Sequence, residues 1–120
     1  MIKKSPLAPR VFPELPAIAG VSLAVGETMI KYHNRSDLVL VKLEAGTTAA
    51  GVYTRSCTAA APVEWCRKAI KNGLAEALVI NSGNANAFTG KAGELSVERT
   101  VEAVAGILSC NPSNIFVAST

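Results

Sequence analysis

Residues 76–90 read EALVINSGNANAFTG, and this stretch decides the fold. It begins with an apolar run at 77–80 that is short and β-branched enough for a strand buried on both faces. In the loop that follows, Asn81, Asn84 and Asn86 alternate with small residues. Asn and Gly tolerate left-handed backbone, and Asn side chains bond the backbone groups that a tight loop leaves free. We therefore predict that residues 81–89 fold back on themselves, against the simpler interpretation of a plain polar connection.

Three apolar runs upstream predict further strands. Residues 18–25 alternate weakly and stop at Gly26, whereas LVLVKL at 38–43 is a stronger β pattern that follows turn residues. Residues 50–54 are predicted to return as a third strand. Together with 38–43 they are expected to form a hairpin.

Two helices are expected on either side of the 77–80 strand. Pro62 suits the first helical position, Cys66 falls on an apolar face with its neighbours at spacings of three and four, and Gly73 is a typical helix stop. The second helix is predicted from about residue 91 to 108, with its acidic residues on a solvated face. Its one-sided apolar stripe is Val97, Val101, Val104, Ala105 and Leu108.

A last short strand is expected at 115–118, so the order is strands, helix, strand, helix, strand. That order predicts an α/β fold, a layered mixed sheet whose two helices cover one face. Four prolines between Pro6 and Pro16 predict that residues 1–16 form an extended arm. Because the chain stops at Thr120 directly after an apolar strand, residues 1–120 are interpreted as a single incomplete domain, the N-terminal fragment of a longer protein.

Composition excludes several classes of protein. The chain is 49% hydrophobic and 18% charged, which is typical of a globular domain, and no apolar run approaches the roughly 20 residues of a membrane span. The net charge of +3 is scattered, so nucleic-acid binding is not expected. Cys57, Cys66 and Cys110 are interpreted as unpaired thiols of a protein in the reducing cytoplasm. His33 is interpreted as a solvated turn residue.

The residues by themselves carry little recognisable chemistry. We find no GxxxxGK or GxGxxG loop, no paired carboxylates, no nucleophile beside a base and no metal-binding cluster. No cofactor or metal is therefore predicted. The residues alone support an α/β domain with a constrained loop rich in Asn and Gly.

Three segments in the right order nevertheless resemble one family. NSGNANA at 81–87, followed by Thr89-Gly90, is similar to the signature loop of the ornithine acetyltransferase (glutamate N-acetyltransferase) family. AGVYTR at 50–55 with AAPV at 60–63 resembles that family's strand and first helix start. VAST at 117–120 resembles the segment that carries its oxyanion hole. The resemblance extends over nearly the whole chain.

The resemblance implies an acyltransferase of arginine biosynthesis with a layered α/β fold. Such enzymes move acetyl from N-acetylornithine to glutamate, and some also use acetyl-CoA. The family's precursor cuts itself before a Thr, which becomes the N-terminus of a β chain and acts as nucleophile with its own amine as base. A β chain and an oligomer are therefore expected partners. The 120-residue chain lacks that nucleophile, so it is expected to be inactive alone.

The resemblance places one catalytic position in this sequence. Thr120 matches the Thr of the oxyanion hole, while the Gly that follows it in the family is absent here. The simpler interpretation is that Thr120 is an ordinary β-branched strand residue. A loop near the active site is expected to act as scaffold, because amides do not titrate; its residues are Asn81, Ser82, Gly83, Asn84, Asn86, Thr89 and Gly90.

Two small departures from the family are visible. Tyr53 stands where Phe is usual and Ser56 where Asn is frequent, and both are expected to affect packing only. Two other functions remain open from the sequence. One is a non-catalytic interaction module that pairs through an exposed sheet edge at its short terminal strand. The other is a self-processing aminopeptidase of related layering, which the Asn/Gly loop disfavours.

Overall fold

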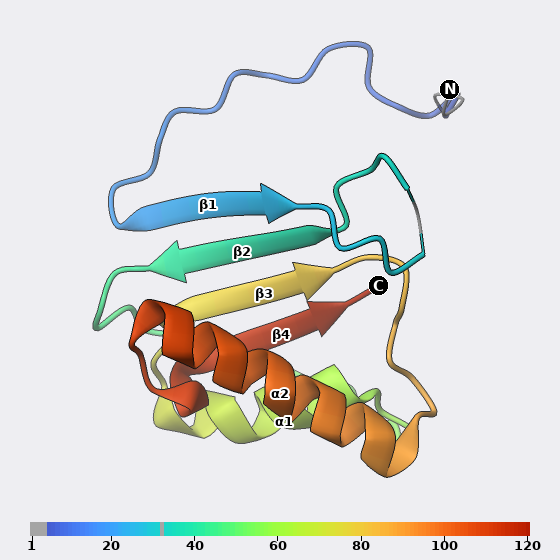
Figure 1. Cartoon of the computed structure of the whole chain (residues 1–120). Coiled ribbons are helices and arrows are strands. Elements are labelled where there is room, and N and C mark those ends of the chain that lie inside the picture. The colour runs from blue at the N-terminus through green and yellow to red at the C-terminus, as the bar shows by residue number, and fades with distance from the viewer. Residues whose placement is uncertain (1–4, 32) are drawn as a thin grey trace.

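The computed structural model describes residues 5–31 and 33–120, which form one four-stranded sheet and two α-helices (Figure 1). The strands are β1 (Val21–Gly26), β2 (Leu38–Leu43), β3 (Ala77–Asn81) and β4 (Ile115–Ser119). The helices are α1 (Ala61–Ala69) and α2 (Gly90–Leu108), with short 3-10 turns at Ile70–Asn72 and Pro112–Asn114.

The sheet is mixed, as predicted. Its strand order is β1-β2-β3-β4, in which β1 and β3 flank β2 antiparallel to it while β3 and β4 are parallel. Parallel strands need a long crossover connection, and α2 supplies it between β3 and β4. The register aligns Leu40, Val79 and Val117 in one row across three strands.

The core lies between that row and α2. The predicted stripe of α2 is confirmed: its valines and Ala105 are buried, and Leu108 packs against the same cluster as a partly buried residue. On the sheet side the cluster contains Ala77, Val79, Ile115 and Val117. The acidic residues of α2 are exposed, also as predicted.

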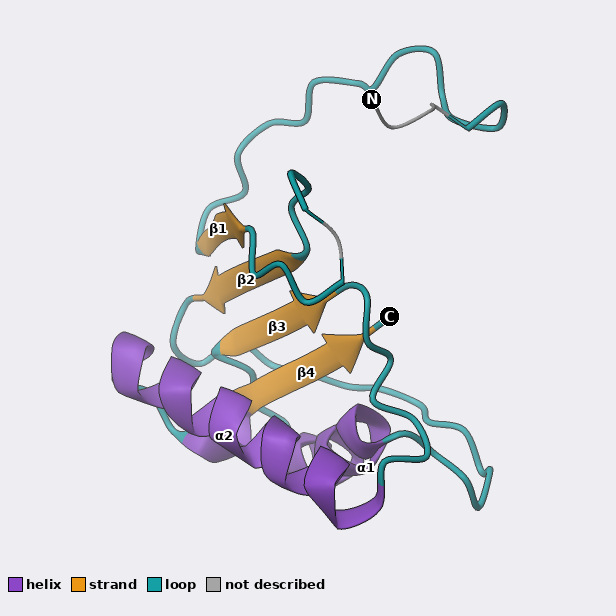
Figure 2. Cartoon of the chain, turned by 45° about the vertical axis from the view of Figure 1, so that its right-hand side comes forward, coloured by secondary structure: helices purple, strands orange, loops and turns teal. Residues whose placement is uncertain are grey.

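Helix α1 lies along the outer edge of β4, and both helices gather on that side of the sheet (Figures 1 and 2). The indole Nε1 of Trp65 donates to the carbonyl of Ile115 at 2.8 Å. Cys66 Sγ lies 3.2 Å from the carbonyl oxygen of Val117 and accepts from its N–H at 3.4 Å. These contacts satisfy backbone groups that an edge strand otherwise leaves free. The short terminal strand, which the sequence favoured as a pairing edge, is therefore covered.

The end of α1 follows the predicted chemistry. After the 3-10 turn, Gly73 takes the left-handed conformation with φ 66° and its N–H bonds the carbonyl of Ile70. This is the usual glycine stop of a helix.

One face of β3 is more open than expected. Ala77 and Val79 are buried against the helices, but Leu78 and Ile80 point to the opposite face and are only half-buried. On β1, Leu23 is 69% exposed. The prediction of a strand buried on both faces was wrong because the helices pack on a single side of the sheet.

Residues 50–54 do not form the predicted strand or hairpin. Both edges of β2 are already paired, with β1 and with β3, so no place remains for this run beside it. Val52 is 98% exposed, and hydroxyls take over the local bonding: Thr54 Oγ1 accepts from the N–H of Ser56, and Ser56 Oγ from that of Thr58. Such side-chain bonds compete with strand pairing.

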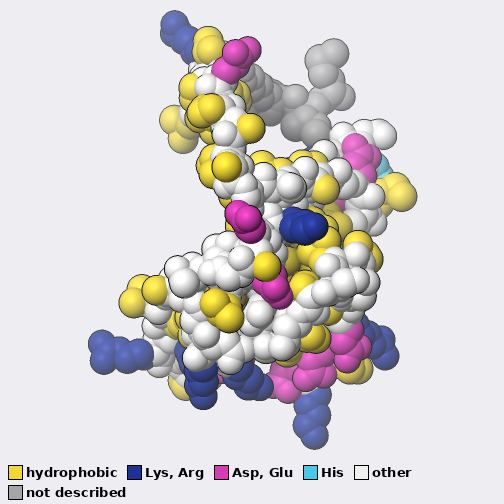
Figure 3. All heavy atoms as spheres, turned by 90° about the vertical axis from the view of Figure 1, so that its left-hand side faces the viewer, with side chains coloured by type: hydrophobic (Ala, Val, Ile, Leu, Met, Phe, Trp, Pro, Cys, Tyr) yellow, Lys and Arg dark blue, Asp and Glu magenta, His cyan; other side chains and the backbone are white. Residues whose placement is uncertain are grey.

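Residues 5–17 form neither helix nor strand, and this arm extends away from the sheet (Figure 1). Its apolar side chains face water: Leu7 is 93% exposed and Leu15 83%. Figure 3 shows hydrophobic side chains along the arm at the top of the view, with charged side chains near its tip and a further group of charged side chains at the bottom. His33 is an exposed bend residue, as predicted. Within the described ranges, no helix has the length and hydropathy needed to cross a membrane.

Candidate functional site

Thr120 meets the first residues of the predicted loop, Asn81 and Gly83, where the parallel strands β3 and β4 end. The backbone N–H of Thr120 donates to the carbonyl of Asn81 at 3.0 Å, and the N–H of Gly83 donates to the carbonyl of Thr120 at 2.7 Å. The structure therefore joins the Asn-rich loop to the end of β4. In open α/β sheets, ligands bind outside the carboxyl ends of the strands, which is the position of this junction.

Asn81 adds side-chain bonds to that junction. Ser119 Oγ donates to Asn81 Oδ1 at 2.6 Å, and Asn81 Nδ2 donates to the carbonyl of Asn84 at 3.0 Å. Asn81 and Ser119 are partners in the parallel register of the two strands. The ends of β3 and β4 are thus connected through both backbone and side chains.

The predicted folding back of the loop is confirmed. Gly83 has φ 104° and Asn86 φ 51°, so both take positive φ as expected for Gly and Asn. Asn84 Oδ1 accepts from the N–H of Asn86 at 3.1 Å, which closes a turn of the kind that Asn side chains form. Phe88 also has a positive φ, of 58°, and the residue is 86% exposed.

Asn86 ties the loop to both helices. It is 8% exposed, its Nδ2 donates to the carbonyl of Gly93 at 3.0 Å, and its Oδ1 accepts from Thr89 Oγ1 at 2.6 Å. Its backbone carbonyl accepts from the N–H of Ala61, at the start of α1, at 3.3 Å. The role of Gly93 was missed by the sequence analysis. The hydrogen-bonded pair Asn86–Thr89 fits beside Gly93 only because Gly93 carries no Cβ.

Asp37 was also missed, and it supports the loop from the other side. It is 3% exposed, and its carbonyl accepts from the N–H of Ser82 at 2.8 Å. Its carboxylate accepts from the N–H and hydroxyl of Thr28, at 2.6 and 2.9 Å, and from the N–H of Ile30 at 3.2 Å. The bond from the Thr28 backbone is the main cause that lowers the pKa of Asp37 below its ordinary value. A single Asp before a strand carries no sequence pattern that would predict this role.

A groove of about 760 Å³ opens between α2 and the sheet and reaches this junction. Val79 and Val117 contribute to its apolar wall, and Asn81, Asn84 and Ser119 contribute polar groups. Its volume is typical of ligand pockets, which are mostly apolar with a few polar groups. Among the described residues, no group of three or more His, Cys, Asp or Glu could hold a metal ion.

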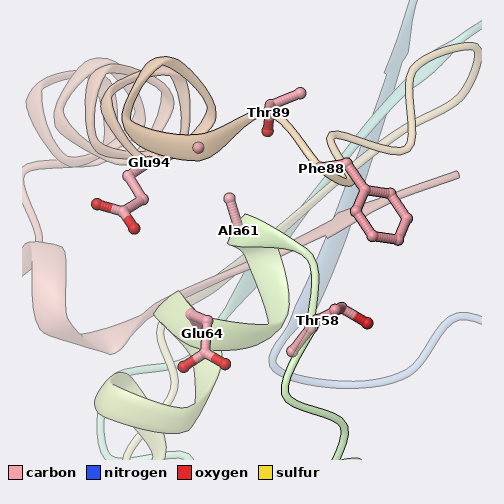
Figure 4. A pocket seen from close by; sticks show the side chains of 8 residues that line it. Thr58, Ala61, Glu64, Phe88, Thr89 and Glu94 are labelled. Atoms are coloured by element: carbon pink, nitrogen blue, oxygen red, sulfur yellow. The ribbon is translucent and has the colours of Figure 1, made fainter.

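A smaller cavity of about 150 Å³ lies at the first turns of α1 and α2 (Figure 4). Figure 4 shows Glu64 on α1 and Glu94 on α2 beside it, with Thr58, Phe88 and Thr89 on the loops. Glu64 forms an ion pair with Arg67 on its own helix. The hydroxyl of Thr89 donates to Asn86 Oδ1, so both groups hold the local structure.

The three cysteines are unpaired, as predicted. Burial raises the pKa of the Cys66 thiol, and burial is also the main cause that raises the pKa of Cys110. Reactive cysteines have a lowered pKa, because the thiolate is the nucleophile. Neither Cys66 nor Cys110 has that property.

Comparison with known proteins decides the family. The sequence profile described as the ArgJ family matches residues 22–120. The chain belongs to the ArgJ family. It is 53% identical over 116 residues to the arginine biosynthesis bifunctional protein ArgJ of Bradyrhizobium diazoefficiens, and 50% identical over 116 residues to that of Mesorhizobium japonicum. In both cases the match covers 97% of this chain and 28% of the relative.

Two similar solved structures confirm the α/β fold. One is ornithine acetyltransferase from Mycobacterium tuberculosis complexed with ornithine, with a TM-score of 0.80 and 40% identity over 85% of this chain and 56% of that one. The other is ArgJ from Bacillus halodurans, with a TM-score of 0.75 and 34% identity over 85% of this chain and 53% of that one. The family resemblance seen in the sequence is thereby confirmed, and the aminopeptidase alternative gains no support.

Proposed function

We propose that this ArgJ chain works within a longer acyltransferase that moves acetyl from N-acetylornithine to glutamate. The observation that carries the proposal is the junction of Thr120 with the Asn81–Gly83 backbone at the carboxyl ends of β3 and β4. Relatives named for arginine biosynthesis support it, as does the ornithine bound by one solved relative. The chain spans about 28% of the length of those curated relatives, so the remainder of the site would come from further sequence.

The proposed chemistry follows the family resemblance. A Thr at the start of a β chain, released by self-cleavage, attacks the acetyl carbonyl, and its own amine takes the hydroxyl proton. The C–N bond breaks, ornithine leaves with a proton, and the acetyl group remains as an ester on Thr. The amine of glutamate then attacks that ester and restores the hydroxyl. Thr120 and the backbone N–H of the following residue would stabilise the negative oxygen of each tetrahedral intermediate.

The same proposal extends to the rest of the chain, to its partners and to its compartment. Residues 1–120 would act as one incomplete domain, in which exposed apolar residues of the arm, such as Leu15, pack on the rest of the enzyme. The expected partners are a β chain from the same precursor and further copies in an oligomer, with acetyl-CoA as a second donor. The three free thiols support a reducing cytoplasm as the compartment.

A chimera tests the function directly. This chain replaces the matching 116 residues of the Bradyrhizobium relative, which is 53% identical, and acetyl transfer from N-acetylornithine to glutamate is measured after self-cleavage. The chimera is expected to be active, while the 120-residue chain alone transfers no acetyl group. Thr120→Ala in the chimera should lower kcat by about 10²–10³-fold, the usual effect of removing one oxyanion donor. Thr120→Ser keeps the hydroxyl and should retain much of the rate. Equal, near-unchanged rates for both variants would disprove the oxyanion role.

A further inference from the structure

We propose that Asn81 is a positioning residue that holds Thr120 in place for the oxyanion hole. The inference rests on the proposed function, because it gives Thr120 a donor role. It goes further by assigning the orientation of that donor to one side chain on the neighbouring strand. The other Asn residues of the loop bond within the loop or to α2, whereas Asn81 bonds to β4.

Asn81 holds two successive residues of β4 with two different oxygens. Its backbone carbonyl accepts from the N–H of Thr120 at 3.0 Å, and its Oδ1 accepts from the hydroxyl of Ser119 at 2.6 Å. The Ser119–Thr120 peptide is thus held through its N–H, and Ser119 is held through its side chain. The position of this peptide helps to set where the Thr120 side chain leaves the strand, while the carbonyl of the next peptide unit accepts from the N–H of Gly83 at 2.7 Å.

The orientation of the Asn81 amide is itself determined. Its Nδ2 donates to the carbonyl of Asn84, which is an acceptor only. A flipped amide would place two oxygens against each other at that contact. The amide therefore has one favourable orientation, with Oδ1 toward Ser119. The loop after β3 thus fixes the Asn81 side chain through Asn84, and the Asn81 side chain holds Ser119 of β4.

The end of β4 needs such support because it lies on an edge strand. The side chains of α1 hold the outer backbone groups of Ile115 and Val117. Ser119 and Thr120 bond instead to Asn81 and Gly83. An oxyanion donor acts only when it lies within about 3 Å of the developing charge, and a displacement of about 1 Å can cost about 10²-fold in rate.

The test is a double-mutant cycle in the chimera with Thr120→Ala as the second change. Asn81→Ala alone should lower kcat by about 10- to 100-fold with little change in KM for either substrate. In the Thr120→Ala background, Asn81→Ala should cost less than about threefold more, because the group that it positions is already gone. Asn111→Ala is the matched control. Asn111 lies before β4, at the opposite end of that strand from Thr120, and its side chain accepts from the N–H of Ser113. Its replacement should leave kcat unchanged.

The outcomes separate the two proposals. A large loss in Thr120→Ala together with an equal Asn81→Ala cost in both backgrounds would overturn the positioning role and leave the oxyanion role intact. An unchanged kcat in Asn81→Ala would do the same. No loss in Thr120→Ala would overturn both. If Asn81→Ala prevents folding or self-cleavage, the same cycle is run with Ser119→Ala, which deletes only the donor to Oδ1 and should show a smaller, several-fold loss that also vanishes without the Thr120 hydroxyl.

Discussion

Gly93 faces Thr89 so closely that a Cβ at position 93 would lie 1.9 Å from Thr89 Oγ1. The same Cβ would lie 2.4 Å from Asn86 Oδ1, the atom that Thr89 Oγ1 bonds. Gly93 is a buried residue of α2, and a positive φ does not explain why glycine stands at this position. The absence of a Cβ explains it, because the first turn of α2 encloses the polar pair Asn86–Thr89, which anchors the Asn-rich loop.

Gly93→Ala should therefore destabilise the protein although Ala is the better helix former. We expect a loss of about 1–3 kcal/mol in the free energy of unfolding, the usual cost of overpacking. Gly106→Ala is the matched control on the same helix, because its added Cβ would meet nothing within 4 Å beyond its chain neighbours and the nearby helix backbone. It should stabilise by up to about 1 kcal/mol. Urea unfolding of the two variants provides the comparison, and equal shifts in one direction would contradict the packing argument.

Asp37 should make stability depend on pH at the acidic end. Its pKa is lowered from 3.8 by bonds to the folded backbone, chiefly from Thr28. A group with a lowered pKa contributes stability that is fully present above its unfolded pKa and is lost as pH falls through its folded value. The free energy of unfolding should thus decline below about pH 4, and Asp37→Asn should flatten that decline.

The measurement is urea unfolding at pH 7 and at several values below pH 4 for the natural chain and Asp37→Asn. Glu102→Gln serves as control, because Glu102 is exposed on α2. An Asp37→Asn variant whose pH dependence matches that of the natural chain would show that this carboxylate is not the responsible group.

The elements that depend on residue spacing within one segment were predicted correctly from the sequence. The stripe of α2, the apolar run of β3 and the Asn-Gly composition of the loop each depend on spacings within one segment, and all three are confirmed. The failures are non-local. Whether residues 50–54 form a strand depends on which edges of β2 are already occupied, and β1 and β3 occupy both.

The candidate site divides in the same way. The sequence singled out Asn81 and Thr120, but not the residues whose importance arises from contacts across the fold. In the sequence, Asp37 lies far before the loop and Gly93 lies about one helical turn after it, and neither forms a pattern with its neighbours. Trp65 likewise gains its role only because β4 lies beside α1.

The cysteines should differ in reactivity in the folded chain. Cys57 is exposed and should react first with a thiol reagent, whereas Cys66 is 7% exposed and bonded to β4. We expect labelling of Cys66 to be more than about tenfold slower, because it requires local opening of α1. Mass spectrometry after timed labelling resolves the order. Three free thiols are expected in denatured, non-reduced protein, and a smaller number would reveal a bridge.

The last prediction concerns β1, the sheet edge opposite α1. Leu23 and Val25 are 69% and 63% exposed on the same face of this strand, and β2 pairs with it on one side only. Exposed apolar strands at a sheet edge favour pairing with another chain. We therefore expect the 120-residue chain to self-associate as concentration rises, and Leu23→Lys to suppress it, since charges on edge strands oppose pairing.

Ile107→Lys is the control, because Ile107 is 74% exposed on α2, away from this edge. Sedimentation over a concentration series measures the outcome. Equal suppression by both variants would locate the association outside β1, and a chain that stays monomeric throughout would remove the support for an interaction module.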